Sequence, residues 1–86
     1  MTEEDDELLS IGATALAVGV PVRTLRSWAE KGYVVPTGGS VGGHVRYTRS
    51  DRVRAIIFRS LREGGQGIGA CMVTLRVLGA LGYIGR

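Results

Sequence analysis

Apolar residues recur at helical spacing in two short stretches near the start of the chain. The hydroxyl of Ser10 can cap the backbone amides of the first stretch, and Gly19 interrupts the pattern. Pro21 has the fixed backbone angle that suits the first turn of a second helix. The sequence therefore predicts a short helix after Ser10, a turn, and a second helix that begins at Pro21. The apolar face of the first helix consists of Ile11, Ala15 and Val18.

The second predicted helix has one apolar face and one basic face. Arg26 and Ser27 lie three and four positions after Arg23, so the three residues share the basic face. A helix, a glycine-containing turn and a second helix with outward arginines form a helix-turn-helix, which presents the second helix to base edges. The alternative is a solvated basic face on an ordinary helical hairpin. The apolar face consists of Val22, Leu25, Trp28 and Ala29.

Glycines dominate the next segment, residues 37–43, and rule out regular structure there. The alternation over residues 44–48 predicts a short strand that pairs back toward Val34 and Val35 across the glycine tip. Arg46 and Tyr47 could donate hydrogen bonds to phosphate oxygens from this strand. We therefore expect a wing that positions the domain on a nucleic acid more than it specifies sequence.

A third helix is predicted to open with Thr48 or Ser50 as its cap and Asp51 in its first turn. Its apolar stripe is expected to close the core. That stripe consists of Val53, Ile56, Ile57 and Leu61.

The segment 68–84 is apolar on too many sides for a simple amphipathic helix, and its glycines and β-branched residues weaken helical propensity. A buried helix is the first interpretation, and a strand remains open. A second hypothesis is that part of this surface mediates self-association, so that copies bind DNA cooperatively side by side. The stretch is interrupted by Arg76 and is shorter than the ~20 residues of a membrane helix, so we expect no membrane partner.

Charge divides the chain into two parts. Residues 3–7 are all acidic, whereas the chain from Leu8 onward has eleven basic and three acidic residues, a formal charge of +8. Ten of the eleven bases are arginine, which suits phosphate and guanine, so a polyanion is the expected partner; simple solubility is the alternative. We expect a disordered acidic tail over residues 1–8 and one domain over residues 9–86.

The sequence offers little for catalysis or metal binding. His44 is the only histidine and Cys71 the only cysteine, so neither a zinc site nor a nucleophile–base pair can be assembled within one chain. Cys71 cannot form an internal disulfide, and no leader opens the chain, which favours a cytoplasmic location at the bacterial nucleoid. We therefore expect no enzyme activity and no cofactor. Cys71 is predicted to be a small buried apolar side chain.

Several of these motifs together resemble the MerR-type winged helix-turn-helix, over about three quarters of the chain. The wing sequence Gly-Gly-His-x-Arg-Tyr is especially similar to that of small excisionases, or recombination directionality factors, and to that of short MerR-like regulators without an effector domain. The chain as a whole resembles the excisionases of mycobacterial phages and prophages. The matching segments are Ile11-Gly12, Gly19-Val20, residues 22–26, Gly42-Gly43-His44, Arg46-Tyr47 and Asp51.

The resemblance implies a mainly α fold with a small β-hairpin wing, in a single winged helix-turn-helix domain. It implies base contacts from the second helix and backbone contacts from the wing. Three positions depart from the family pattern: Val45 stands where a basic residue is common, Pro21 where a Ser or Thr cap is usual, and Ser27 where an aromatic is frequent. The implied base-contacting residues are Arg23, Thr24, Arg26 and Ser27, and the implied backbone-contacting residues are His44, Arg46 and Tyr47.

The function implied by this resemblance is sequence-specific binding of double-stranded DNA. An architectural excisionase that binds attachment-site DNA and directs an integrase toward excision is the favoured role, with an integrase and other copies of the chain as partners. A small MerR-like transcriptional regulator is the alternative, and a module that binds only protein is the third. No small-molecule effector is expected in any of them.

Overall fold

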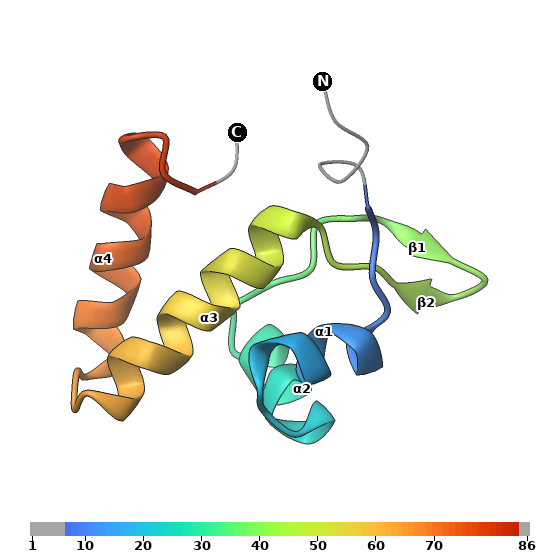
Figure 1. Cartoon of the computed structure of the whole chain (residues 1–86), viewed down its shortest axis with the longest axis horizontal. Helices are drawn as coiled ribbons and strands as arrows, with labels where there is room; N and C mark the ends of the chain where they lie inside the picture. The colour runs from blue at the N-terminus through green and yellow to red at the C-terminus, as the bar shows by residue number, and fades with distance from the viewer. Residues whose placement is uncertain (1–6, 85–86) are drawn as a thin grey trace.

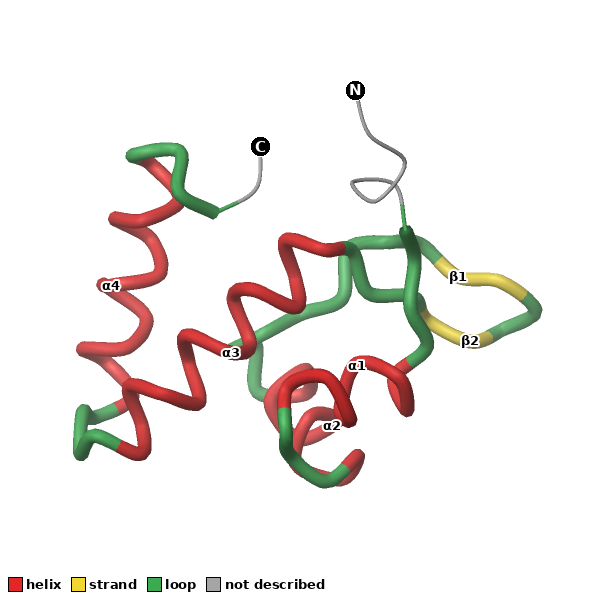
Figure 2. Tube along the Cα trace, in the orientation of Figure 1, coloured by secondary structure: helices red, strands yellow, loops and turns green. Residues whose placement is uncertain are grey.

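The computed structural model describes residues 7–84, so the predicted acidic tail over residues 1–8 lies outside the described part except for Glu7 and Leu8. Helix α3 crosses the middle of the molecule, with α1 and α2 on one side, the β1–β2 hairpin beyond its N-terminal end and α4 beside its C-terminal end (Figure 1). The expected mainly α fold with a small hairpin wing is confirmed (Figure 2). The elements are α1 (Ile11–Val18), α2 (Val22–Glu30), β1 (Ser40–Val41), β2 (His44–Val45), α3 (Arg49–Glu63) and α4 (Ile68–Ala80).

Local backbone chemistry sets the ends of α1 and the start of α2, as predicted. The Ser10 hydroxyl accepts a hydrogen bond from the Ala13 amide at 3.1 Å and so caps α1. Gly19 ends α1 in the left-handed region, with φ of 88°, which favours glycine because a side chain is strained there. Pro21, with φ of −64°, then leads directly into α2.

The cap of α3 is confirmed, and the predicted apolar stripe of this helix is confirmed in part, because three of its four residues pack against the core. Thr48 and Asp51 form a capping box, in which each side chain bonds the backbone amide of the other. Ile56 is 37% exposed, while Val53, Ile57 and Leu61 pack only at the edge of the core. The buried face of α3 is rotated about the helix axis relative to the predicted stripe, because Phe58 lies at its centre. The buried residues of α3 are Asp51, Ala55 and Phe58.

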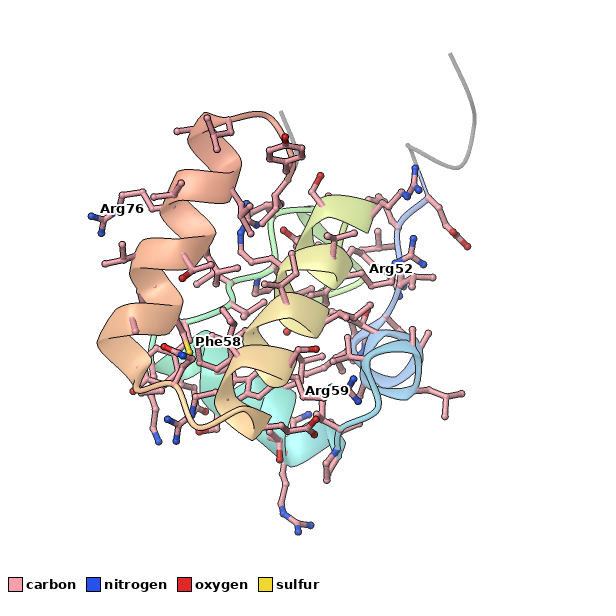
Figure 3. All side chains as sticks on the ribbon, turned by 60° about the vertical axis from the view of Figure 1, so that its left-hand side comes forward. Arg52, Phe58, Arg59 and Arg76 are labelled. Atoms are coloured by element: carbon pink, nitrogen blue, oxygen red, sulfur yellow. The ribbon has the colours of Figure 1, made fainter. Side chains whose placement is uncertain are left out.

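Phe58 lies where α2, α3 and the segment after α2 meet (Figure 3). The Trp28 ring contacts it edge-on at a centroid distance of 4.8 Å, and the Tyr33 ring stacks on it at 5.5 Å. Such aromatic pairs add ~1 kcal/mol each beyond the area they bury. This cluster fixes α2 against α3 through the apolar face of α2, where Leu25 is fully buried.

The partner predicted for the wing strand is wrong. His44–Val45 pairs antiparallel with Ser40–Val41 rather than with residues 34–35, and Val34 is instead fully buried in the core. A two-residue turn joins the strands, and both of its glycines have positive φ, 59° at Gly42 and 83° at Gly43. That geometry is the tight hairpin turn that matches strand twist, so it sets the register.

The segment 68–84, which the sequence left open between helix and strand, is mainly the helix α4, which packs against α3. Cys71 and Leu75 are buried, which confirms the structural role predicted for Cys71. Gly82 turns the chain at φ of 85°, and Ile84 returns to the core at 1% exposure. The opposite side of α4 is exposed, so the helix is buried on one face only. Within residues 7–84, no helix combines the length and apolarity needed to cross a membrane.

Candidate nucleic-acid interface

The basic face of α2 is free while its apolar face is anchored. Arg23 and Arg26 are exposed and lie one turn apart, and Thr24 and Ser27 between and beside them are half-buried. Leu25 and Trp28 hold the helix to the core from the other side. The four residues predicted to contact bases therefore lie on a helix that is rigidly held, with two long guanidinium side chains free to reach outward.

The wing presents a different set of donors. His44 is exposed on β2, and Arg46, just after the strand, is half-buried. The hairpin continues past its strands, because the Gly38 amide donates to the Arg46 carbonyl at 2.9 Å and the Arg46 amide donates to the Gly39 carbonyl at 2.9 Å. These bonds hold Arg46 in a fixed position near the base of the wing.

A groove of about 510 Å³ lies between α2 and the wing. Arg26 lines it from α2, and His44 and Arg46 line it from the wing. The groove thus brings together one predicted base contact, Arg26, and all three predicted backbone contacts, whereas Arg23, Thr24 and Ser27 are not among its lining residues. The remaining lining residues are Ser10, Ile11, Ala29, Glu30, Pro36, Gly43, Val45 and Tyr47.

Tyr47 does not fit the phosphate contact expected for it. Its side chain is fully buried, and its hydroxyl has no hydrogen-bond partner within residues 7–84. Tyr47 is among the lining residues of the groove, but its side chain lies below the surface, whereas that of Arg46 is partly exposed. Burial raises the pKa of the Tyr47 phenol, the Asp51 charge raises it further, and the Arg26 charge lowers it. Tyr47 is a core residue beneath the groove.

Asp51 fastens the base of the wing to α3. Its buried carboxylate accepts bonds from the Thr37 amide at 2.7 Å, the Thr37 hydroxyl at 2.8 Å and the Thr48 amide at 2.9 Å. A carboxylate with several short donors is stabilised in a position where an unpaired charge would be costly. The sequence predicted Asp51 in the first turn of the helix, but no local pattern indicated its bond to Thr37, fourteen positions earlier.

The segment before α1 supports the wing from its other edge. The Leu9 and Tyr47 backbones exchange two hydrogen bonds, at 2.9 and 2.8 Å, as an isolated antiparallel bridge. Glu7 lies 3.7 Å from the Arg52 guanidinium on α3. The wing is therefore tied to α3 through Asp51 and to the start of the domain through Leu9, two contacts that sequence analysis missed because both join distant segments.

The chemistry available at this surface is hydrogen bonding and charge attraction. Nowhere in residues 7–84 do three His, Cys, Asp or Glu side chains group closely enough to hold a metal ion. Guanidinium and imidazole groups on a convex helix and a protruding hairpin can engage phosphate oxygens and base edges of a duplex.

Comparison with known proteins gives the family. No curated protein matches the chain. The family described as MerR HTH family regulatory protein matches residues 9–77, which include α1, α2, the wing, α3 and most of α4. The match spans most of the chain and coincides with the element order of a winged helix-turn-helix. The chain therefore belongs to the MerR HTH family of regulatory proteins.

Proposed function

We propose that this protein binds double-stranded DNA in a sequence-specific manner, with α2 in the major groove and the wing against the phosphate backbone. A MerR-type helix-turn-helix suggests such binding. The observation that carries the proposal is the groove lined by Arg26 of α2 and by His44 and Arg46 of the wing. Two elements that are distant in sequence supply cationic donors to one surface there.

The two elements divide the work. Arg23 and Arg26 are long enough for each to donate two hydrogen bonds to the edge of one guanine. Each such contact is worth ~1–3 kcal/mol of discrimination against another base. The side chains of Thr24 and Ser27 are shorter and half-buried, so they reach only those DNA groups that the arginines hold close to the helix. His44 and Arg46 donate to phosphates and fix the register of α2 without specifying sequence. Tyr47 has no direct DNA contact in this proposal.

Binding to random DNA measures how much of the affinity is specific. A library of random duplexes is enriched on the full-length protein, and the selected duplex is compared with its scrambled version at one salt concentration. The selected duplex should bind at least ~10³-fold more tightly, which is typical of specific DNA-binding domains. Equal affinity for both duplexes would contradict the proposal and favour a module that binds only protein.

The biological role of this binding is proposed from the wing. The Gly-Gly-His-x-Arg-Tyr sequence around the hairpin turn is similar to that of small phage excisionases, which favours an architectural accessory that directs an integrase. The family description, a regulatory protein, favours a transcriptional regulator instead. Both roles use the same DNA-binding surface, so they differ only in the site bound and in the partner.

A footprint beside an integrase assay separates the two roles. The full-length protein is footprinted on the attachment-site DNA and the promoter nearest its gene, and excision by the integrase is followed with and without it. Several protected attachment sites with integrase-dependent stimulation would support the accessory role. Protection of the promoter with no change in excision would support the regulator.

A further inference from the structure

A second hollow, of about 250 Å³, lies between α3 and α4 and shares no residue with the groove described above. Met72 and Leu75 of α4 give it an apolar floor, and both of its charged side chains are arginines, Arg54 and Arg76. The complete lining is Tyr33, Arg54, Met72, Leu75, Arg76 and Gly79. No residue predicted to contact DNA lines it.

The two arginines are available to an anionic ligand. Arg76 is exposed and makes no hydrogen bond or ion pair with any residue in the range 7–84. Arg54 approaches Asp51 only at 3.5 Å, while the shorter bonds of that carboxylate, at 2.7 to 2.9 Å, come from Thr37 and Thr48. Guanidinium donors above an apolar floor fit a peptide that combines carboxylates with aliphatic groups.

The chain itself contains such a peptide. Residues 3–6 are four consecutive acids, and the methyl group of Thr2 and the methylenes of Glu3 and Glu4 supply aliphatic surface beside the carboxylates. The chain from Leu8 onward has a formal charge of +8, so this segment is opposite in charge to the rest of the chain. We propose that the hollow between α3 and α4 binds the acidic N-terminal segment, residues 2–6, of a second copy of this chain.

The position of the segment's root favours a neighbouring copy over the same copy. Leu9 is fixed by its bridge to Tyr47, and Glu7 lies beside Arg52. Arg52 and Arg54 are two positions apart on α3 and hence about 200° apart around its axis. Figure 3 shows Arg52 and Arg76 extending on opposite sides of the molecule. The body of α3 therefore separates the root of the segment from the hollow of the same copy.

Such a contact joins unlike surfaces, so each copy offers one acidic segment and one hollow and can link to two neighbours. Individual exposed ion pairs contribute little, which makes the contact weak in solution and sensitive to salt. Copies held on adjacent DNA sites have effective concentrations in the ~mM range, where a weak contact becomes occupied. The contact itself does not rest on the proposed DNA binding and can be tested without DNA.

Crosslinking between isotopically distinct copies tests the proposal. A photoreactive amino acid replaces Thr2 in the full-length protein, light and heavy copies are mixed at low salt without DNA, and the crosslinked peptides are identified by mass. Crosslinks from residue 2 should join light to heavy copies at the residues of the hollow. The yield should fall roughly fivefold in Arg76→Glu and stay unchanged in Arg23→Glu, which makes the same change in net charge on α2.

A charge exchange guards against indirect effects of the Arg76 substitution. Replacing Glu3, Glu4, Asp5 and Asp6 by lysine in one labelled copy should restore crosslinking to Arg76→Glu copies, and circular dichroism should show both variants folded. Arg76→Gln, which only removes the charge, should give an intermediate yield. The proposal would be overturned by crosslinks within single copies or by crosslinks to α2 or the wing. It would also be overturned by a yield that changes neither with the Arg76 substitutions nor with the charge exchange. None of these outcomes depends on whether the protein binds DNA.

Discussion

At the scale of single residues, Asp51 has more bonds than any other buried polar side chain in the described structure. It caps α3 through Thr48 and holds the wing through Thr37, with donor–acceptor distances of 2.7 to 3.1 Å. The capping half of this arrangement is local and follows from the sequence. The other half depends on the return of the chain to Thr37, which only the folded structure shows.

Replacing Asp51 by asparagine tests this clamp. The amide keeps the volume but loses the charge and one acceptor, and its NH₂ group faces the donors of Thr37 and Thr48. We expect the free energy of unfolding in denaturant titration to fall by about 3 kcal/mol. Thr37→Val removes the hydroxyl bond alone and should cost about 1 kcal/mol. Equal, small losses for the two variants would mean that the carboxylate is not the centre of the clamp.

Tyr47→Phe tests the revised role of that residue. Because the hydroxyl is buried without a partner in the described range, its removal should leave stability unchanged or slightly higher. Affinity for the selected duplex should change by less than about 0.5 kcal/mol, roughly twofold. A phenol that donated to phosphate would instead give a clear loss of affinity, and that result would return Tyr47 to the interface.

The raised pKa of Tyr47 also predicts a pH effect. Its folded pKa exceeds the unfolded value near 10.0, so the phenol contributes stability that is complete below pH 10 and is lost as the pH rises through the folded pKa. The unfolding free energy of the native protein should therefore fall more steeply above pH 10 than that of Tyr47→Phe. Parallel curves would show that the buried phenol is not the titrating group responsible.

At the scale of elements, the wing depends on a close approach of two backbones. A Cβ at Gly38 would lie 2.7 Å from the Arg46 carbonyl oxygen and 3.0 Å from the Leu8 side chain, so the strands must separate to admit it. Gly69, inside α4, has no such neighbour within 4 Å. The two glycines therefore make a matched pair for the same substitution.

Gly38→Ala should destabilise the domain by about 1–3 kcal/mol, as overpacking does, and weaken DNA binding through the displaced wing. Gly69→Ala should instead stabilise it by about 0.5–1 kcal/mol, because alanine favours a helix interior and meets open space there. Thermal unfolding followed by circular dichroism distinguishes the signs. Stabilisation by both substitutions would show that the wing tolerates a wider spacing than this structure has.

Sequence patterns predicted where helices and strands form better than they predicted which segments pair or pack together. The boundaries of α1, α2 and α3 follow from Ser10, Pro21 and Thr48, which act on their immediate neighbours. The wing strand was assigned the wrong partner, although the Gly42-Gly43 pair between two short runs is itself a signal for a tight hairpin. Apolar spacing identified the buried side of α3 only in part, because Val53, Ile57 and Leu61 pack against the core while its centre is Ala55 and Phe58.

The candidate site shows the same limit. The positions of Arg23 and Arg26 follow from helical periodicity alone, and the structure exposes both. Alternation along the wing could have indicated that Tyr47 is buried where Arg46 is partly exposed. The bridge between Leu9 and Tyr47 could not have been predicted, since no local pattern specifies a single backbone pairing across thirty-eight positions.

At the scale of the whole molecule, the two candidate binding surfaces are separate. The wing and α4 lie at opposite ends of the longest axis of a domain that measures 36 × 31 × 18 Å (Figure 2). A duplex on α2 and the wing therefore leaves the hollow between α3 and α4 open to a neighbouring copy. The apolar residues on the outer side of α4 keep the hypothesis of self-association through that face open as well; they are Val73, Val77 and Leu81.

We propose above all that α2 specifies the DNA sequence and that the wing binds backbone phosphates. The measurement that tests it most directly is the salt dependence of affinity for the selected and scrambled duplexes, made with the native protein, Arg26→Ala and Arg46→Ala. Arg26→Ala should lose about 1–3 kcal/mol on the selected duplex and much less on the scrambled one. Arg46→Ala should weaken both equally and reduce the slope of log K against log salt by about one. Equal losses on both duplexes for both variants would contradict this division between helix and wing.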